Sequence, residues 1–344
     1  MSQQSLQDLP PKWAHFCLDI NSFVHKELGL DLVGKNLLLA ASRGVDSTAL
    51  ILWGHLLGHR LEATVKAAHL NHGLRQEAHT EAASLQELCH NLGIPLGLGR
   101  TDSATYARRR DLGLEEAGRI LRYRFVTRTA HKLGADYVLT AHHLNDLAED
   151  ILMRQIRGTG WPALAGMPAW TPSTRLLRPF LLTPKDDLRR FVQACGHTWM
   201  EDASNQDLQF TRNRVRQHLL PVLVQENPKF LHQTADLWRQ ARIDHSFWDQ
   251  DLAIHIQSER PLDQGILLPA QHLDRLHAAQ RLRWYRSVLD RLGPGQVLAG
   301  TLFQLDRAWR MKSRPKRFQF PGAKEVRVSA QGLLCTVDHC SSLG

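Results

Sequence analysis

Short apolar runs alternate with longer helical patterns along the first half of this 344-residue chain. The runs with the length and composition of buried strands cover residues 36–41, 61–69, 94–98 and 136–141. The helical patterns between and after them cover residues 46–57, 77–92, 114–133 and 146–157. Strands separated by helices of this length are typical of a parallel sheet with helices on both faces. The alternation therefore predicts an α/β domain.

The second half of the chain is predicted to be mainly helical. Its helical patterns cover residues 184–194, 211–223, 229–256 and 273–292, and a basic stretch follows at 307–317. Two short β patterns at 318–320 and 325–328 predict a terminal hairpin, with 333–337 as a candidate third strand. We expect an α/β domain over residues 1–215 and a smaller, mainly helical and basic domain over residues 216–344.

The net charge indicates a polyanionic partner. The formal charge is +9 and the sequence pI is about 9.6. An excess of this size favours nucleic acid first and an acidic membrane surface second. A solvated basic surface without a partner is the alternative.

The cysteines and apolar runs indicate a cytoplasmic location. The five cysteines are scattered and form no C-x-x-C pair, which favours reduced thiols over a disulfide framework. The N-terminus lacks the apolar core of a signal peptide. No apolar run approaches the ~18 residues of a membrane span, so we expect no membrane partner.

A polar loop follows the first predicted strand and begins the first helix. It consists of Ser42, Arg43, Gly44, Val45, Asp46 and Ser47. In an open parallel sheet, ligands bind beyond the carboxyl ends of the strands, and a helix N-terminus favours an anion there. Asp46 would repel phosphate unless a magnesium ion bridges the two. The loop predicts a phosphate-binding site, and an ordinary capped turn is the alternative.

Polar side chains also follow two other predicted strands. His69 and Asn71 lie at the end of the second strand, where a satisfied polar loop is the common alternative to a ligand site. Asp146 and Glu149 lie three residues apart at a helix start, so they share a face and could hold magnesium or act as a base. The alternative for this acidic pair is capping of the helix N-terminus.

Two arginine clusters complete the set of candidates. Arg119 and Arg122 share one face of a predicted helix, and a surface salt-bridge ladder is the alternative. Arg212, Arg214 and Arg216 alternate near a helix start. This density is too high for a routine salt-bridge face and predicts contact with phosphate or RNA.

The loop S-R-G-V-D-S resembles the S-G-G-x-D-S loop of the N-type ATP pyrophosphatases, or PP-loop proteins, which cleave ATP between its α- and β-phosphates. Arg43 stands where that pattern has its first glycine. If the position needs a positive φ, arginine is strained there. The alternative is that its guanidinium group adds a phosphate contact.

The order of the motifs resembles the tRNA(Ile)-lysidine synthase family more specifically. The matching segments are S-x-G-V-D-S, H-L-N-H-G-L-R, E-E-A-x-R-x-x-R-Y, A-H-H-x-x-D-x-A-E, R-G-T-G, and E-D-x-S-N followed by R-N-R-V-R. They extend from Ser42 to Arg216, whereas the chain after residue 225 resembles the family only in general character. Gly118 and Asp150 are small departures, at positions where alanine and threonine are usual.

The resemblance implies an activity and its ligands. Members of the family use ATP to adenylate the oxygen on carbon 2 of the wobble cytidine in the CAU anticodon of an isoleucine tRNA, and L-lysine then replaces AMP. The implied ligands are ATP, magnesium, L-lysine and this tRNA, and a homodimer is left open.

The resemblance also implies roles for the candidate residues. Loop 42–47 would hold the ATP phosphates with Asp46 toward magnesium, and His69 and Asn71 would line the adenosine pocket. Asp146 and Glu149 would bind metal or the lysine ammonium group, or act as the base. Substrate or tRNA contacts are implied for Arg119, Arg122, Arg212, Arg214 and Arg216.

In the second domain, basic residues are expected to follow the tRNA backbone. These residues are Arg281, Arg283, Arg286, Lys312, Arg314, Lys316 and Arg317. One rival is a tRNA-binding PP-loop protein with impaired or lost catalysis, which Arg43 motivates. A tRNA thiolase is disfavoured, because it would need cysteines for sulfur transfer or for an iron–sulfur cluster.

Overall fold

The computed structural model describes residues 5–71, 78–200, 208–263, 265–312 and 315–337. The motif residues 72–75 and 201–205 lie outside the described residues. The chain forms two compact units. The first comprises Met1–Thr159 and Ala163–Trp238, and the second comprises Gly160–Pro162 and Arg239–Gly344.

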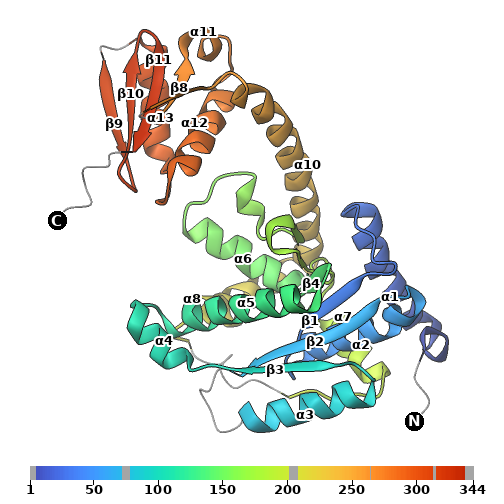
Figure 1. The fold of residues 1–344 in the computed structure, drawn as a ribbon. Helices are drawn as coiled ribbons and strands as arrows, with labels where there is room; N and C mark the ends of the chain where they lie inside the picture. Colours follow the sequence, from blue (N-terminus) through green and yellow to red (C-terminus); the bar gives the residue numbers. More distant parts are fainter. Residues whose placement is uncertain (1–4, 72–77, 201–207, 264, 313–314, 338–344) are drawn as a thin grey trace. The chain divides into compact units, whose positions relative to one another are not determined.

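A six-stranded sheet forms the centre of the first unit (Figure 1). Its strands in chain order are β1 (Asn36–Ala40), β2 (Thr64–Asn71), β3 (Leu96–Arg100), β4 (Tyr137–Leu139), β5 (Trp170–Thr171) and β6 (Leu176–Leu177). The spatial order is β3-β2-β1-β4-β6-β5, and all neighbours pair in parallel except β5 and β6. The predicted α/β domain with a parallel sheet is confirmed.

Helices cover both faces of this sheet. The helices of the first unit are α1 (Pro11–Ser22), α2 (Val45–Arg60), α3 (Ala78–Asn91), α4 (Ser103–Arg110), α5 (Leu114–Leu133), α6 (Leu144–Ile156), α7 (Lys185–Ala194), α8 (Thr211–Arg214) and α9 (Leu220–Glu226). Shorter helical turns are η1 (Leu6–Asp8), η2 (Phe23–Glu27), η3 (Ala163–Ala165), η4 (Pro172–Thr174) and η6 (Val215–Leu219), which joins α8 to α9. Leu37 and Leu39 of β1 pack in a core with α1, α2, α3 and α7, whereas Leu38 packs in a second core with α5. Because successive side chains of a strand point to opposite faces, one apolar strand serves both cores.

Helix α2 approaches the sheet closely at two glycines. Gly54 and Gly58 lie one helical turn apart. A Cβ atom at these positions would lie 2.9 Å from Leu39 Cδ1 and 2.7 Å from Val65 Cγ2, respectively. Since α2 begins at the predicted phosphate loop, this close packing fixes the loop against the carboxyl end of β1.

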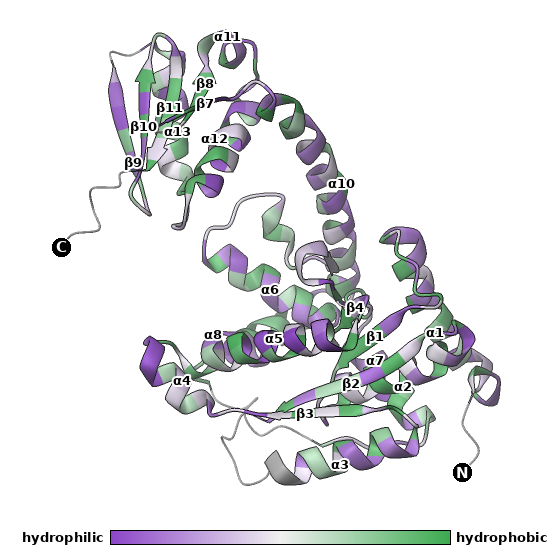
Figure 2. Cartoon of the chain, in the orientation of Figure 1, coloured by the Kyte–Doolittle hydropathy of each residue, from purple (hydrophilic) through white to green (hydrophobic). Residues whose placement is uncertain are grey.

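The second unit contains an antiparallel sheet of five strands. These are β7 (Arg260–Leu262), β8 (Gly265–Pro269), β9 (Lys316–Phe320), β10 (Lys324–Ser329) and β11 (Gly332–Val337), in the order β7-β8-β11-β10-β9. The predicted hairpin and third strand are β9, β10 and β11, and β7 and β8 extend the sheet beyond the prediction. Figure 2 shows β11, in the middle of the sheet, as mainly hydrophobic and the edge strand β9 as mainly hydrophilic. Charged residues on an edge strand discourage pairing with other chains.

The helices of the second unit pack against this sheet. They are α11 (Ala270–Leu273), α12 (Ala278–Leu292) and α13 (Ala299–Arg310), and the part of α10 (Phe230–Ile256) that follows Trp238 belongs to the same unit. Trp284 of α12 is fully buried. Arg281 was predicted to contact the tRNA backbone. Its side chain is instead buried, and its Nε lies 2.6 Å from Asp306 Oδ1. In the part of the chain that the structure describes, no helix is long and apolar enough to cross a membrane.

The first compact unit extends beyond the parallel sheet and its crossover helices. It includes α8, η6, α9 and the start of α10, where the indole N–H of Trp238 donates to the backbone oxygen of Met167 at 3.0 Å. The functional boundary at residue 215, between ATP binding and tRNA binding, stays a prediction.

Substitution of Gly58 by valine should destabilise the first unit. The difference in helix propensity between valine and glycine is smaller than the free-energy cost of overpacking. The added methyl groups would meet Val65 and should lower the free energy of unfolding by about 1–3 kcal/mol. Urea unfolding followed by circular dichroism measures this change.

The control variant is Gly113→Ser. Gly113 is the N-cap of α5, where serine is favoured, and a Cβ there meets nothing within 4 Å. This variant should stay within about 0.5 kcal/mol of the wild type. Equal unfolding midpoints for Gly58→Val and the wild type would contradict the close packing of α2.

Candidate active site

The loop between β1 and α2 is held by a hydrogen bond within itself. Ser47 Oγ accepts this bond from the backbone N–H of Ser42 at 2.6 Å. Gly44 is the N-cap of α2, with φ −66° and ψ 158°. Arg43 is not among the residues with positive φ, so its backbone is unstrained. The N-terminus of α2 therefore lies at the carboxyl end of β1 in ordinary backbone geometry, as an anion site requires.

The guanidinium group of Arg43 is engaged by the protein itself. Its Nε donates to Ser84 Oγ at 2.8 Å, and its Nη1 lies 2.6 Å from the backbone oxygen of Thr198 and 3.3 Å from Thr48 Oγ1. The alternative of a phosphate contact by Arg43 stays a prediction.

Two residues predicted to line the nucleotide pocket lie at the end of β2. His69 is buried, and its Nδ1 lies 2.9 Å from the backbone oxygen of Ala41. Because a carbonyl oxygen only accepts, Nδ1 carries the hydrogen. Asn71 ends β2, and its backbone oxygen accepts from the N–H of Thr101 at 2.9 Å. His69 thus supports the loop backbone, and the adenosine contacts of both residues stay predictions.

The two carboxylate oxygens of Asp46 have different surroundings. Oδ2 lies 3.4 Å from His143 Nε2 and 3.8 Å from Lys185 Nζ. Oδ1 is buried and has no hydrogen-bond partner among the described residues. A buried polar atom of this kind is costly unless a ligand satisfies it. Since carboxylate oxygen is a preferred ligand of magnesium, Asp46 fits a magnesium site.

His143 connects Asp46 to the next acidic residue. It is buried and caps α6, where its Nδ1 accepts from the N–H of Asp146 at 3.3 Å. The hydrogen of the neutral ring therefore lies on Nε2, which is 3.4 Å from Asp46 Oδ2 and 3.4 Å from Asp146 Oδ2. Burial alone would lower the pKa of His143, but the charge of Asp146 and the hydrogen bond to Asp46 raise it.

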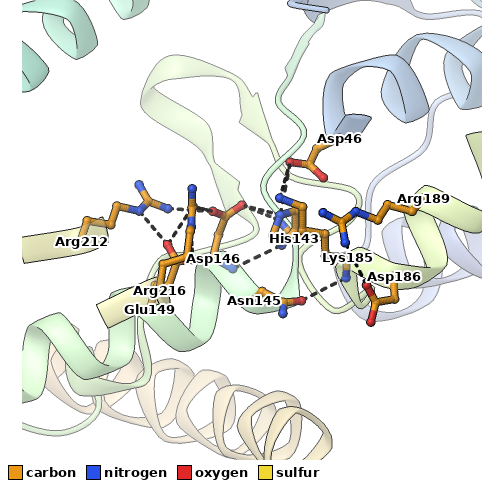
Figure 3. A network of polar contacts seen from close by, with 10 residues as sticks. All are labelled: Asp46, His143, Asn145, Asp146, Glu149, Lys185, Asp186, Arg189, Arg212 and Arg216. Atoms are coloured by element: carbon orange, nitrogen blue, oxygen red, sulfur yellow. Dashed lines mark hydrogen bonds and ion pairs between the residues drawn. The ribbon is translucent and has the colours of Figure 1, made fainter. Parts of the chain in front are cut away.

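Two buried carboxylates and two arginines form a closed ion-pair network (Figure 3). Glu149 is 1% exposed, with Oε1 2.6 Å from Arg216 Nε and Oε2 2.9 Å from Arg212 Nε. Asp146 Oδ1 lies 2.8 Å from Arg212 Nη2 and 3.2 Å from Arg216 Nη2. Each arginine bridges both carboxylates, so the four formal charges cancel. The structure thus joins four predicted site residues that the sequence places in separate clusters.

His143 and the two arginines together set the ionisation of Asp146. Burial would raise the pKa of this carboxyl, but the charges of His143 and Arg212 hold it well below its usual range. Burial lowers the pKa of the adjacent His142 to about 3, so that ring is neutral near neutral pH. Asp146 is therefore an ionised carboxylate beside an uncharged imidazole.

The other predicted arginines have different surroundings. Arg214 donates from Nη1 to two backbone oxygens in the turn before α8, at 2.8 and 2.7 Å. Arg119 and Arg122 are exposed on α5, and the guanidinium carbon of Arg119 lies 5.9 Å from the ring centroid of Tyr123. Their tRNA contacts, and any contact by Arg214, stay predictions.

Two residues of the site were not predicted from the sequence. His143 stands in the A-H-H motif, which does not indicate which histidine faces the carboxylates. Lys185 is the first residue of α7, after Pro184. A positive charge is unfavourable at a helix N-terminus, so this placement is a sequence signal for a role outside the helix.

The fold and the loop define a class of nucleotide-binding protein. Residues 15–223 match the PP-loop domain family, which covers more than half of the chain. The fold is similar to that of U34-tRNA thiolase NcsA from Methanococcus maripaludis, with a TM-score of 0.55 and 14% identity over 66% of this chain and 78% of that one. At this identity the likeness concerns the fold alone. The chain has a PP-loop ATP-binding domain.

Relatives with higher identity narrow this class. A tRNA(Ile)-lysidine synthase from Nitratidesulfovibrio vulgaris is 43% identical over 84% of this chain and 88% of the relative. One from Petrotoga mobilis is 30% identical over 71% of this chain and 75% of the relative. One from Enterococcus faecalis is 34% identical over 72% of this chain, which spans 54% of that longer relative. The chain belongs to the tRNA(Ile)-lysidine synthase family.

Replacement of Asp146 by asparagine should lower stability in a pH-dependent way. The folded pKa of Asp146 lies below the unfolded value of about 3.9. The stabilisation by its carboxylate is therefore present above that value and is lost as pH falls toward the folded pKa. At neutral pH the variant leaves two guanidinium groups with one carboxylate, which should lower the free energy of unfolding by about 3–5 kcal/mol.

Urea unfolding at several pH values measures this difference, which should shrink progressively below about pH 4. Asp150→Asn is the matched control on the same helix. Asp150 pairs with Arg154 at 2.8 Å, but its side chain is 23% exposed, so its loss should cost less than about 1 kcal/mol. A difference between Asp146→Asn and the wild type that stays constant with pH would contradict the network.

Proposed function

We propose that this protein ligates L-lysine to carbon 2 of the wobble cytidine in the CAU anticodon of an isoleucine tRNA and converts ATP to AMP and pyrophosphate. The family and the order of motifs support this reaction. The single observation that carries the proposal is the polar connection from the loop to the acidic pair. Asp46 Oδ2 and Asp146 Oδ2 each lie 3.4 Å from His143 Nε2. A two-step reaction needs its phosphate cradle and its amine-binding group side by side, and this connection supplies both.

The first proposed step activates a poor leaving group. The oxygen on carbon 2 of cytosine bonds to the α-phosphorus of ATP, the bond to the β-phosphate oxygen breaks, and pyrophosphate leaves. Backbone N–H groups of residues 43–47 and the hydroxyls of Ser42 and Ser47 hold the phosphates. A magnesium ion on Asp46 would neutralise phosphate charge. Lys185, with Nζ 3.8 Å from Asp46 Oδ2, adds a positive charge beside this cradle.

The second proposed step replaces AMP by lysine. The ε-nitrogen of lysine bonds to carbon 2, the bond between carbon 2 and the adenylated oxygen breaks, and AMP leaves. Asp146 and Glu149 bind the incoming ammonium group, and one of them accepts the proton that frees its lone pair. The second proton, lost after the carbon–nitrogen bond forms, goes to the departing AMP or to water. Arg212 and Arg216 take neither proton, because guanidinium groups are already protonated.

At least some ion pairs of Arg212 and Arg216 have to break before lysine can bind the carboxylates. Both oxygens of Glu149 and Oδ1 of Asp146 already lie within ion-pair distance of a guanidinium group. The side chains of Arg212 and Arg216 are 31% and 27% exposed, so a phosphate can reach them from solvent. In our proposal the tRNA backbone takes over at least one arginine and thereby opens the lysine site.

The second unit supplies basic surface for the same tRNA. Arg286 of α12, Lys312, and Lys316 and Arg317 of β9 are exposed. Arg314 lies outside the described residues. Contacts of this kind with phosphates make binding fall steeply with salt.

The alternative is a tRNA-binding member of the family that has lost catalysis. Arg43 in place of glycine motivates it. The unstrained backbone at Arg43 and the enzyme name shared by the relatives do not favour this alternative.

Incubation with ATP, labelled lysine and unmodified isoleucine tRNA with a CAU anticodon tests the proposal. The expected result is label in the tRNA, with AMP and pyrophosphate formed in equal amounts. The same tRNA with its wobble cytidine replaced by uridine is the control and should stay unlabelled. Absence of both label and AMP release would overturn the proposal in favour of the binding-only alternative.

Asp146→Asn and Glu149→Gln should lower lysine transfer by about 10²-fold or more, because each removes a group that binds or deprotonates the amine. Release of pyrophosphate from ATP and tRNA in the absence of lysine should fall much less. Asp150→Asn, on the same helix, should retain lysine transfer. Circular dichroism verifies folding of each variant. Full lysine transfer in either Asp146→Asn or Glu149→Gln would refute the assignment.

A further inference from the structure

Arg43 contacts three segments of the first unit. Its side chain contacts Ser84 of α3, Thr48 of α2 and the backbone oxygen of Thr198, which follows α7. Its own backbone oxygen accepts from the N–H of Met200 at 3.0 Å. Arg43 therefore binds the segment Thr198–Met200 at two points, once through its side chain and once through its backbone.

The arrangement uses the fork geometry of arginine. Nε and Nη1 point to different acceptors, Ser84 Oγ at 2.8 Å and the Thr198 oxygen at 2.6 Å. A planar guanidinium group can serve both at once, whereas a lysine ammonium group is a single point. Burial lowers the pKa of Arg43 although the charge of Glu87 opposes this effect, consistent with a guanidinium group withdrawn from solvent.

We propose that Arg43 is a positioning residue that clamps the segment Thr198–Met200 onto the phosphate loop and so holds the loop in its ATP-binding geometry. This inference deepens the proposed function and rests on it only for its kinetic test. A glycine at this position has no side chain for such a clamp and leaves the loop more conformational freedom. Because the clamped loop is already ordered, it loses less conformational entropy when ATP binds.

A direct contact with phosphate makes different predictions. If Arg43 acted through its charge on ATP, lysine would replace it well and Ser84 would not matter. If Arg43 acts as a clamp, Arg43→Lys should behave much like Arg43→Gly, and Ser84→Ala should give a smaller loss in the same direction.

Hydrogen exchange at the Met200 amide tests the clamp without any substrate. In Arg43→Gly the acceptor, the backbone oxygen of residue 43, is still present, but the side-chain bond to the Thr198 oxygen is lost. The Met200 amide should therefore exchange about tenfold faster or more in Arg43→Gly and Arg43→Lys than in the wild type. Equal exchange in wild type and Arg43→Gly, or wild-type exchange in Arg43→Lys, would overturn the clamp.

Steady-state kinetics distinguish an effect on ATP binding from an effect on the chemical step. In Arg43→Gly the KM for ATP should rise about tenfold, while kcat at saturating ATP changes less than about twofold. A lower kcat with unchanged KM would overturn the positioning role. If no lysine transfer is detected even in the wild type, the proposed function fails, whereas the exchange measurement still decides the clamp.

Discussion

The pairing of Asp146 and Glu149 with Arg212 and Arg216 is the interaction on which the site depends. Burying two carboxylates is expensive unless charged partners lie close to them. The two arginines supply that compensation from a helical segment more than 60 positions away in the chain. The ion pairs therefore dock α8 and η6 against α6 and, together with His143, keep Asp146 ionised. They also leave the cluster with no net charge to attract a further cation.

His143 connects the ion-pair network to the phosphate loop. Its Nδ1 accepts from the first turn of α6, which turns Nε2 toward Asp46 and Asp146 together. Lys185 reaches Asp46 from α7, so three helix N-termini meet at the carboxyl edge of the sheet. The loop and the acidic pair are thus electrostatically coupled. A change in the contacts of the arginines therefore alters the electrostatic potential near Asp46.

The sequence predicted the parallel sheet well, because its strands are apolar and the helices between them are long. The pattern over residues 114–133 matches α5 at both ends. Short elements escaped prediction. Helix α4 is polar and has no apolar period, and β5 and β6 span two residues each. Strand β7 contains Pro261 and strand β8 ends at Pro269, and prolines indicate breaks rather than strands.

The candidate residues were predicted better than their arrangement. Asp146, Glu149, Arg212 and Arg216 were all selected from the sequence, but their mutual pairing was not, because no local pattern relates positions 66 apart. Arg43 suggested strain or a phosphate contact, whereas its backbone has no positive φ and its side chain binds Ser84 and Thr198. Those partners come from distant segments, so only the folded chain reveals them.

The affinity for L-lysine, measured by calorimetry, tests most directly whether Arg212 and Arg216 compete with lysine for the carboxylates of Asp146 and Glu149. Lysine should be titrated into the protein alone and into the protein saturated with unmodified isoleucine tRNA and a non-hydrolysable ATP analogue. The expected result is binding at least about tenfold tighter in the presence of tRNA, because phosphates then compete for Arg212 and Arg216. The same affinity in both states would contradict the exchange of partners at Asp146 and Glu149.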